Sequence, residues 1–174
     1  KVVQLQLEPE INLDWTPGQY INLITDSGLS RSYSIASVAQ EDYFITLHVG
    51  HVENGAVSTW IHDELKPGDF VRIQGPMGDC FYRPEDAHRP LLLLGTGTGI
   101  APLYAILRDA LSRGHQPPIQ IFHGASSPEE LYLDQELREL ARLHNNLTYS
   151  PVVSDLTCRG PWQNGWLTDL AFDA

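Results

Sequence analysis

The chain has 174 residues, which is enough for one large domain or two small ones with a hydrophobic core. A net charge of −11, with no cluster of lysine or arginine, disfavours nucleic acid and anionic membranes as partners. No apolar run approaches the roughly 20 residues of a membrane-spanning helix. The cysteines, Cys80 and Cys158, are too few for a disulfide framework or a four-thiolate iron–sulfur cluster, so we expect a cytoplasmic setting.

The first half of the chain alternates apolar and polar residues with a period of two, which is typical of half-buried strands. Such stretches lie at residues 3–7, 21–23, 43–49 and 71–73, with turn-forming residues between them. Several short strands at this spacing predict a small antiparallel barrel. One short helix is expected within it, over residues 58–65, with Ser58 as its N-cap.

The second half alternates strands with helices. Apolar runs predict strands at 91–94, 119–123 and 147–153, and helical spacing predicts helices at 103–113 and 128–143. The second helix is expected to begin at Ser127, followed by a proline and a glutamate in the first turn. This βαβαβ order predicts a parallel sheet. We therefore divide the chain into two domains, residues 1–86 and 87–174.

A glycine-rich segment, Gly95-Thr96-Gly97-Thr98-Gly99-Ile100-Ala101-Pro102, lies where the first of these strands turns into a helix. Glycines let the backbone approach a ligand closely, and the free N–H groups of the first helical turn attract phosphate. A tight turn that binds nothing explains the same glycines equally well.

Two segments of the first half could also hold a nucleotide. Alternation places Arg31 and Tyr33 on one face of a strand, where a guanidinium can pair with phosphate and a ring can stack on a planar ligand. An exposed cross-strand pair is the alternative. Gly55-Ala56-Val57-Ser58 leads into the short helix and could seat an anion, or could simply cap that helix.

Taken in order, these motifs resemble the ferredoxin–NADP reductase superfamily of flavoenzymes. The resemblance runs nearly end to end and includes four further segments: Pro17-Gly18-Gln19-Tyr20, Leu65-Lys66-Pro67-Gly68-Asp69, Gly75-Pro76-Met77-Gly78 and His123-Gly124-Ala125. It is nearest to reductase components that oxidise NAD(P)H for oxygenases or iron–sulfur partners. It implies a six-stranded antiparallel FAD barrel over 1–86 and an incomplete α/β NAD(P)-binding domain over 87–174.

The resemblance also implies roles for single residues in flavin binding. Arg31 would bind the FAD pyrophosphate, Tyr33 would cover the isoalloxazine, and Ser34, the catalytic side chain, would contact flavin N5. Two residues of a later strand would lie along the flavin through their backbone: His48 and Val49. Three residues at the helix start would hold the FAD phosphates: Gly55, Val57 and Ser58. His48 and His51 do not converge on a strand, so no metal site is predicted.

For the second cofactor, the resemblance implies a pyrophosphate site on the glycine-rich segment, made by Gly95, Thr96, Gly97, Thr98, Gly99 and Pro102. Ser126 would face the adenine ribose. Many relatives have an arginine there, so its absence favours NADH slightly over NADPH. The implied activity is hydride transfer from NAD(P)H to FAD, with electrons passed on to an iron–sulfur protein or oxygenase component, either separate from the chain or fused to it.

Two alternatives remain open from the sequence. One is a free flavin reductase, and the other is a non-catalytic flavin-binding electron-transfer or regulatory subunit. Counterparts of the family's first barrel strand and of its C-terminal strands are missing, so we expect an excerpt of a longer polypeptide. Such an excerpt can be inactive even where the parent protein is an enzyme.

Overall fold

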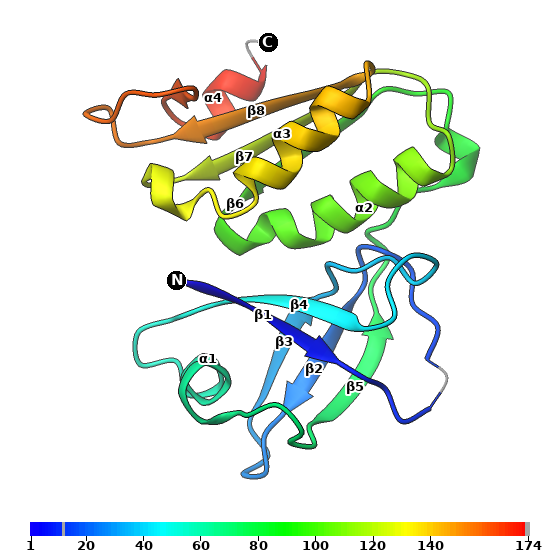
Figure 1. Ribbon diagram of the computed structural model, residues 1–174, viewed down its shortest axis with the longest axis vertical. Helices are drawn as coiled ribbons and strands as arrows, with labels where there is room; N and C mark the ends of the chain where they lie inside the picture. The colour runs from blue at the N-terminus through cyan, green and yellow to red at the C-terminus, as the bar shows by residue number, and fades with distance from the viewer. Residues whose placement is uncertain (12, 173–174) are drawn as a thin grey trace.

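The computed structural model describes residues 1–11 and 13–172. Two units lie one above the other along the long axis of the molecule (Figure 1). The N-terminus lies near the junction of the units, and the last described residues of the chain lie at the far end of the second unit.

The first unit contains five strands: β1 (Val2–Leu7), β2 (Tyr20–Ile24), β3 (Ser30–Ser34), β4 (Ile45–Gly50) and β5 (Arg72–Met77). They form two antiparallel sheets, one with the order β1-β4 and one with the order β3-β2-β5. An isolated antiparallel bridge between Ile35 and Leu47 joins the sheets. The predicted antiparallel barrel is therefore present, with five strands in the part of the chain that the structure describes.

The core of the barrel follows the predicted period of two. Alternate residues of β2 and β4 are fully buried and pack together: Ile21, Leu23, Ile45, Leu47 and Val49. No ladder joins β1 to β5 among the described residues, and a groove of about 1430 Å³ opens between these two strands. None of the predicted cofactor-binding residues lines this groove.

The short helix begins earlier than predicted. It comprises α1 (Ala56–Thr59) and a π-helical turn (Trp60–Glu64), and Gly55 is its N-cap, so the assignment of Ser58 as the N-cap is wrong. The Ser58 hydroxyl accepts a hydrogen bond from the Val52 N–H at 3.2 Å and lies 3.0 Å from the Gly55 carbonyl. Because the side chain is used to close the preceding turn, the helix starts at that turn rather than at the serine.

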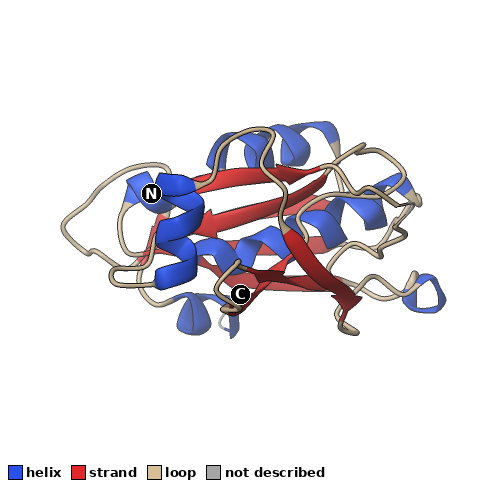
Figure 2. Ribbon diagram, turned by 90° about the horizontal axis from the view of Figure 1, so that it is seen from below, coloured by secondary structure: helices blue, strands red, loops and turns tan. Residues whose placement is uncertain are grey.

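The second unit is built on a parallel sheet, as predicted. Its strands are β6 (Leu91–Thr96), β7 (Ile119–Ala125), β8 (Leu147–Val153) and β9 (Gln163–Asn164), in that spatial order. Helices α2 (Ile100–Ser112) and α3 (Asp134–Leu143) pack on one face of the sheet, and α4 (Leu167–Phe172) packs on the other. The view from below shows helices on both sides of the strands (Figure 2).

The predicted helix over 128–143 is divided. Pro128–Glu130 forms a 3₁₀ turn, and α3 starts only at Asp134. Leu131 and Leu133 are both buried, whereas helical positions two apart point in different directions, so a continuous helix could not bury both against one sheet. Ser127 precedes the turn without a side-chain capping bond. Two further 3₁₀ turns lie at Pro84–Asp86 and Gly97–Gly99. No described helix is both long and apolar enough to cross a membrane.

Candidate functional site

Strands β3 and β4 diverge at the residues predicted to contact the flavin. The single bridge that follows β3 would, if its register continued, set Ser34 opposite His48 and Tyr33 opposite Val49. Instead β3 pairs with β2, and β4 pairs with β1. The two strands therefore lie at the boundary between the two sheets. The predicted flavin-contacting residues of β3 are on one side of this boundary and those of β4 are on the other.

The side chains of the Arg-x-Tyr-Ser segment fit a nucleotide ligand. Arg31 is exposed, and its Nη1 donates only to the adjacent Ser30 carbonyl, at 2.8 Å; no carboxylate pairs with it among the described residues. Tyr33 is half-buried against the barrel core, and this burial raises the pKa of its phenol despite the nearby arginine. The Ser34 hydroxyl is half-buried and has no hydrogen-bond partner in the described part of the chain. An arginine side chain that is not paired with a carboxylate is available to bind a phosphate.

The residues of β4 have distinct environments. The Val49 side chain is fully buried in the barrel, and its carbonyl accepts a hydrogen bond from His62 Nε2 at 2.9 Å. His48 points out of the barrel toward the second unit, where its Nδ1 lies 3.0 Å from the Tyr132 hydroxyl. His51 packs edge-on against His62, so His48 and His51 have different neighbours. No group of three or more His, Cys, Asp or Glu residues is placed to hold a metal ion among the residues that the structure describes.

The start of α1 offers backbone donors. With Gly55 as the N-cap, the N–H groups of Val57 and Ser58 belong to the first helical turn, where no intrahelical acceptor exists. The Val57 side chain and the Ser58 hydroxyl are buried, so these residues can meet a phosphate only through their backbone.

The glycine-rich segment forms an open 3₁₀ turn between β6 and α2. A Cβ on Gly95 would come within 2.9 Å of Ile100, which explains the glycine by packing alone. Gly97 has a φ of +50°, and a Cβ on Gly97 or Gly99 would meet nothing within 4 Å. One side of the turn is therefore open, with the amide groups of a helix start beside it, and this arrangement fits a pyrophosphate. Thr98 lies within this turn, Thr96 precedes it, and Pro102 follows it in α2.

The predicted flavin-contacting residues of β3, β4 and α1 form one candidate cradle, and the glycine-rich turn forms the other. The strand β4 and the glycine-rich turn meet at one contact. Gly50 ends β4, and a Cβ built on it would come within 3.3 Å of Thr98 Cγ2 in the glycine-rich turn. The strand predicted to lie along the flavin thus touches the loop predicted to bind the second cofactor.

The structure gives Ser126 an acidic neighbour. A carboxylate oxygen of Glu130 accepts a hydrogen bond from the backbone N–H of Ser126 at 3.0 Å, at the end of β7. The carboxylate therefore lies beside the position predicted to face the adenine ribose.

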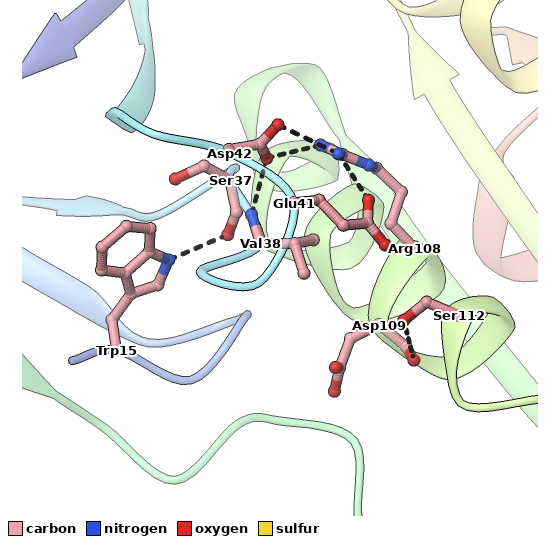
Figure 3. Close-up of polar contacts among 8 residues, drawn as sticks. All are labelled: Trp15, Ser37, Val38, Glu41, Asp42, Arg108, Asp109 and Ser112. Carbon is pink, nitrogen blue, oxygen red and sulfur yellow. Dashed lines mark hydrogen bonds and ion pairs between the residues drawn. The ribbon is translucent and has the colours of Figure 1, made fainter.

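Sequence reasoning missed an ion-pair cluster that joins the units. Arg108 of α2 donates to Asp42 Oδ2 at 2.8 Å, to Asp42 Oδ1 at 3.1 Å and to Glu41 Oε2 at 2.7 Å (Figure 3). Asp42 also accepts a hydrogen bond from the Val38 N–H, and Trp15 Nε1 donates to the Ser37 carbonyl of the same barrel segment (Figure 3). The cluster anchors the helix that follows the glycine-rich turn to the barrel, and we call it the Arg108 clamp.

Removing the Arg108 clamp should destabilise the protein. The Arg108→Met variant is expected to lose about 1–3 kcal/mol of unfolding free energy, because two carboxylates lose charged hydrogen bonds at a partly buried junction. Arg142→Met is the matched control, since the Arg142–Glu139 pair is well exposed on α3. Urea unfolding of the two variants should therefore differ. Equal midpoints for both would contradict this role of Arg108.

Comparisons with known proteins agree with the geometry. The family described as "Oxidoreductase FAD-binding domain" matches residues 1–82, and the family described as "Oxidoreductase NAD-binding domain" matches residues 93–168. The chain is 40% identical over 147 residues to the reductase subunit of an aromatic O-demethylase from Amycolatopsis sp., covering 82% of this chain and 44% of that protein. It is 37% identical over 155 residues to reductase component 2 of a terephthalate 1,2-dioxygenase from Comamonas sp., covering 89% and 46%.

A solved structure shows the same arrangement. The crystal structure of a cytochrome P450 reductase from Amycolatopsis matches 99% of this chain and 53% of its own, with a TM-score of 0.91 and 35% identity. The chain thus spans about half the length of these relatives. Its FAD-binding barrel, followed by a parallel NAD-binding sheet, places the chain in the ferredoxin–NADP reductase superfamily.

Proposed function

We propose that the protein is a flavoprotein reductase that transfers hydride from NAD(P)H to FAD and passes electrons to an iron–sulfur or oxygenase partner. The observation that carries this proposal is the contact between Gly50 of β4 and Thr98 of the glycine-rich turn, which brings the two predicted cradles together. The reductase names of the relatives support the same reaction class. Bound FAD supplies the hydride acceptor and the redox chemistry, and the protein supplies binding and orientation.

The chain's own residues would each have a defined task. Arg31 would neutralise the FAD pyrophosphate together with the backbone N–H groups of Val57 and Ser58. Tyr33 would cover one side of the flavin, and Ser34 would donate a hydrogen bond near N5. No general base is assigned, because hydride transfer from a reduced nicotinamide needs none.

Ser34→Ala should slow reduction of the bound flavin while FAD stays bound. One donor near the reacting atom is lost, and a single lost donor of this kind costs roughly 100- to 1,000-fold in rate. Stopped-flow measurement at the flavin absorption band would report the rate, and the absorption of the purified protein would report the FAD content. An unchanged reduction rate would rule out this role for Ser34.

We propose NADH as the preferred donor, supported by the Glu130 carboxylate beside the Ser126 amide. A negative charge there would repel the 2′-phosphate of NADPH. Glu130→Gln keeps a hydrogen-bond acceptor of the same size and removes the charge. The preference for NADH, measured as the ratio of kcat/KM values, should fall about five- to tenfold. A ratio that does not change would show that this carboxylate does not select the donor.

Purification followed by anaerobic mixing with NADH tests the proposal against its alternatives. Retained yellow colour and rapid bleaching of the bound flavin are expected for the full-length protein. Flavin that is lost on gel filtration but reduced when added back would indicate a free flavin reductase. Bound flavin that NADH cannot reduce would indicate a non-catalytic subunit. The partner is proposed to be a redox protein in the cytoplasm.

A further inference from the structure

Tyr132 connects the two units through a pair of histidines. It lies between the 3₁₀ turn Pro128–Glu130 and α3, and its hydroxyl is 3.0 Å from Nδ1 of His48 on β4. The His48 and Tyr132 rings also meet edge to face, with centroids 5.4 Å apart. On its other side, Tyr132 meets the ring of His123 on β7 in the same manner, at 5.7 Å. His48 is predicted to contact the flavin through its backbone, and no cofactor contact is predicted for the side chains of His48, Tyr132 and His123.

The histidines on either side of Tyr132 are buried and have few other hydrogen-bond partners in the described part of the chain. His48 is 6% exposed and His123 is fully buried, and neither ring nitrogen of His123 has a hydrogen-bond partner among the described residues. Without the Tyr132 hydroxyl, Nδ1 of His48 would lose its protein partner in a buried place, which is costly unless the strand shifts to admit water. The position of β4 is therefore sensitive to this one hydroxyl.

Both ends of the connection adjoin the candidate cradles. His48 is two residues before Gly50, whose backbone lies against Thr98. His123 is the partner of Gly95 in the register of β6 and β7, directly beside the glycine-rich turn. We propose that Tyr132 is a positioning residue that sets the separation of the flavin-side strand β4 and the glycine-rich turn. This inference rests on the proposed reductase function.

Apart from the Gly50–Thr98 contact, the junction near His48 is loosely packed. The Arg108 clamp holds α2 to the barrel at Asp42, and a cavity of about 210 Å³ lies between the clamp and His48, since both Arg108 and His48 line it. Close packing is therefore missing between the two points of attachment. Loss of the Tyr132 hydroxyl would allow β4 to shift relative to the turn while the clamp keeps the units together.

The test compares Tyr132→Phe with Tyr149→Phe in the full-length protein. Tyr149 also loses a hydroxyl bond, but its partner is Asp134, in the second unit. In FAD-loaded protein, Tyr132→Phe should lower the limiting rate of flavin reduction about tenfold and leave the half-saturating NADH concentration unchanged, because a small displacement of reacting groups affects the rate more than binding. Tyr149→Phe should keep the wild-type rate.

A second readout needs no cofactor. In FAD-free protein, hydrogen exchange of the β4 amides (residues 45–50) and of residues 97–99 should speed up together in Tyr132→Phe and not in Tyr149→Phe. If Tyr132→Phe does not fold, His48→Leu removes the same bond from the barrel side and is read in the same two ways. Equal exchange in the Tyr132 and Tyr149 variants overturns the inference. Wild-type protein that NADH cannot reduce overturns the proposed function instead, and the exchange result still decides the positioning role.

Discussion

Arg31→Ala should cause FAD to dissociate from the protein during gel filtration. The guanidinium is exposed, lies on the same face of β3 as Tyr33, and is not paired with a carboxylate among the described residues. A single charged pair with a pyrophosphate accounts for roughly 10- to 100-fold in affinity. The loss should therefore concern the cofactor, with little change in the stability of the FAD-free protein.

Arg72→Ala is the matched control for this prediction. Arg72 is also an exposed arginine of the barrel, but it belongs to β5 and pairs with Ile24 on the other side of the sheet. Its removal should leave FAD bound. Full flavin retention by Arg31→Ala, or equal losses in both variants, would contradict the assignment of Arg31 to the pyrophosphate.

Acidification below pH 6.5 should destabilise the FAD-free protein through its buried histidines. Burial lowers the pKa of His48 and of His123 to about 4, from an ordinary value of 6.5, and it lowers the pKa of His115 in the same direction. Between pH 6.5 and 4, the unfolded chain binds protons that the folded protein does not bind. The free energy of unfolding therefore falls as the pH drops through this range.

The expected size of this effect makes it measurable. Lowering the pH from 7 to 5 should reduce the free energy of unfolding by about 2 kcal/mol for each of His48 and His123. Urea unfolding at the two pH values measures the difference. His123→Leu should remove a large part of this difference. An identical pH dependence in wild type and His123→Leu would show that His123 does not titrate as its burial predicts.

The sequence predicted the strands and the order of the units well, because apolar alternation and apolar runs directly report burial. The glycine-rich turn was also located correctly, since only a strand-to-helix junction fits its flanking residues. Helix starts were predicted less well. Ser58 and Ser127 are both good capping residues, yet the hydroxyl of Ser58 closes the turn before it and Ser127 makes no capping bond. Local propensity does not reveal such competing partners.

The junction between the units could not be predicted from the chain alone. Arg108 and Asp42 are 66 residues apart, and His48 and Tyr132 are 84 apart, and no periodicity connects such positions. A single histidine on a strand has the same appearance in sequence whether it packs in a core or reaches another domain. The roles of the individual site residues therefore stay predictions that depend on the family resemblance.

A crystal structure of the full-length protein with FAD and NAD bound would test the central claim most directly. The account predicts the FAD pyrophosphate at Arg31 and the start of α1, the NAD pyrophosphate at residues 97–99, and the flavin and nicotinamide rings in contact beside Gly50 and Thr98. Flavin bound elsewhere, for example in the groove between β1 and β5, or rings held too far apart to touch, would contradict it.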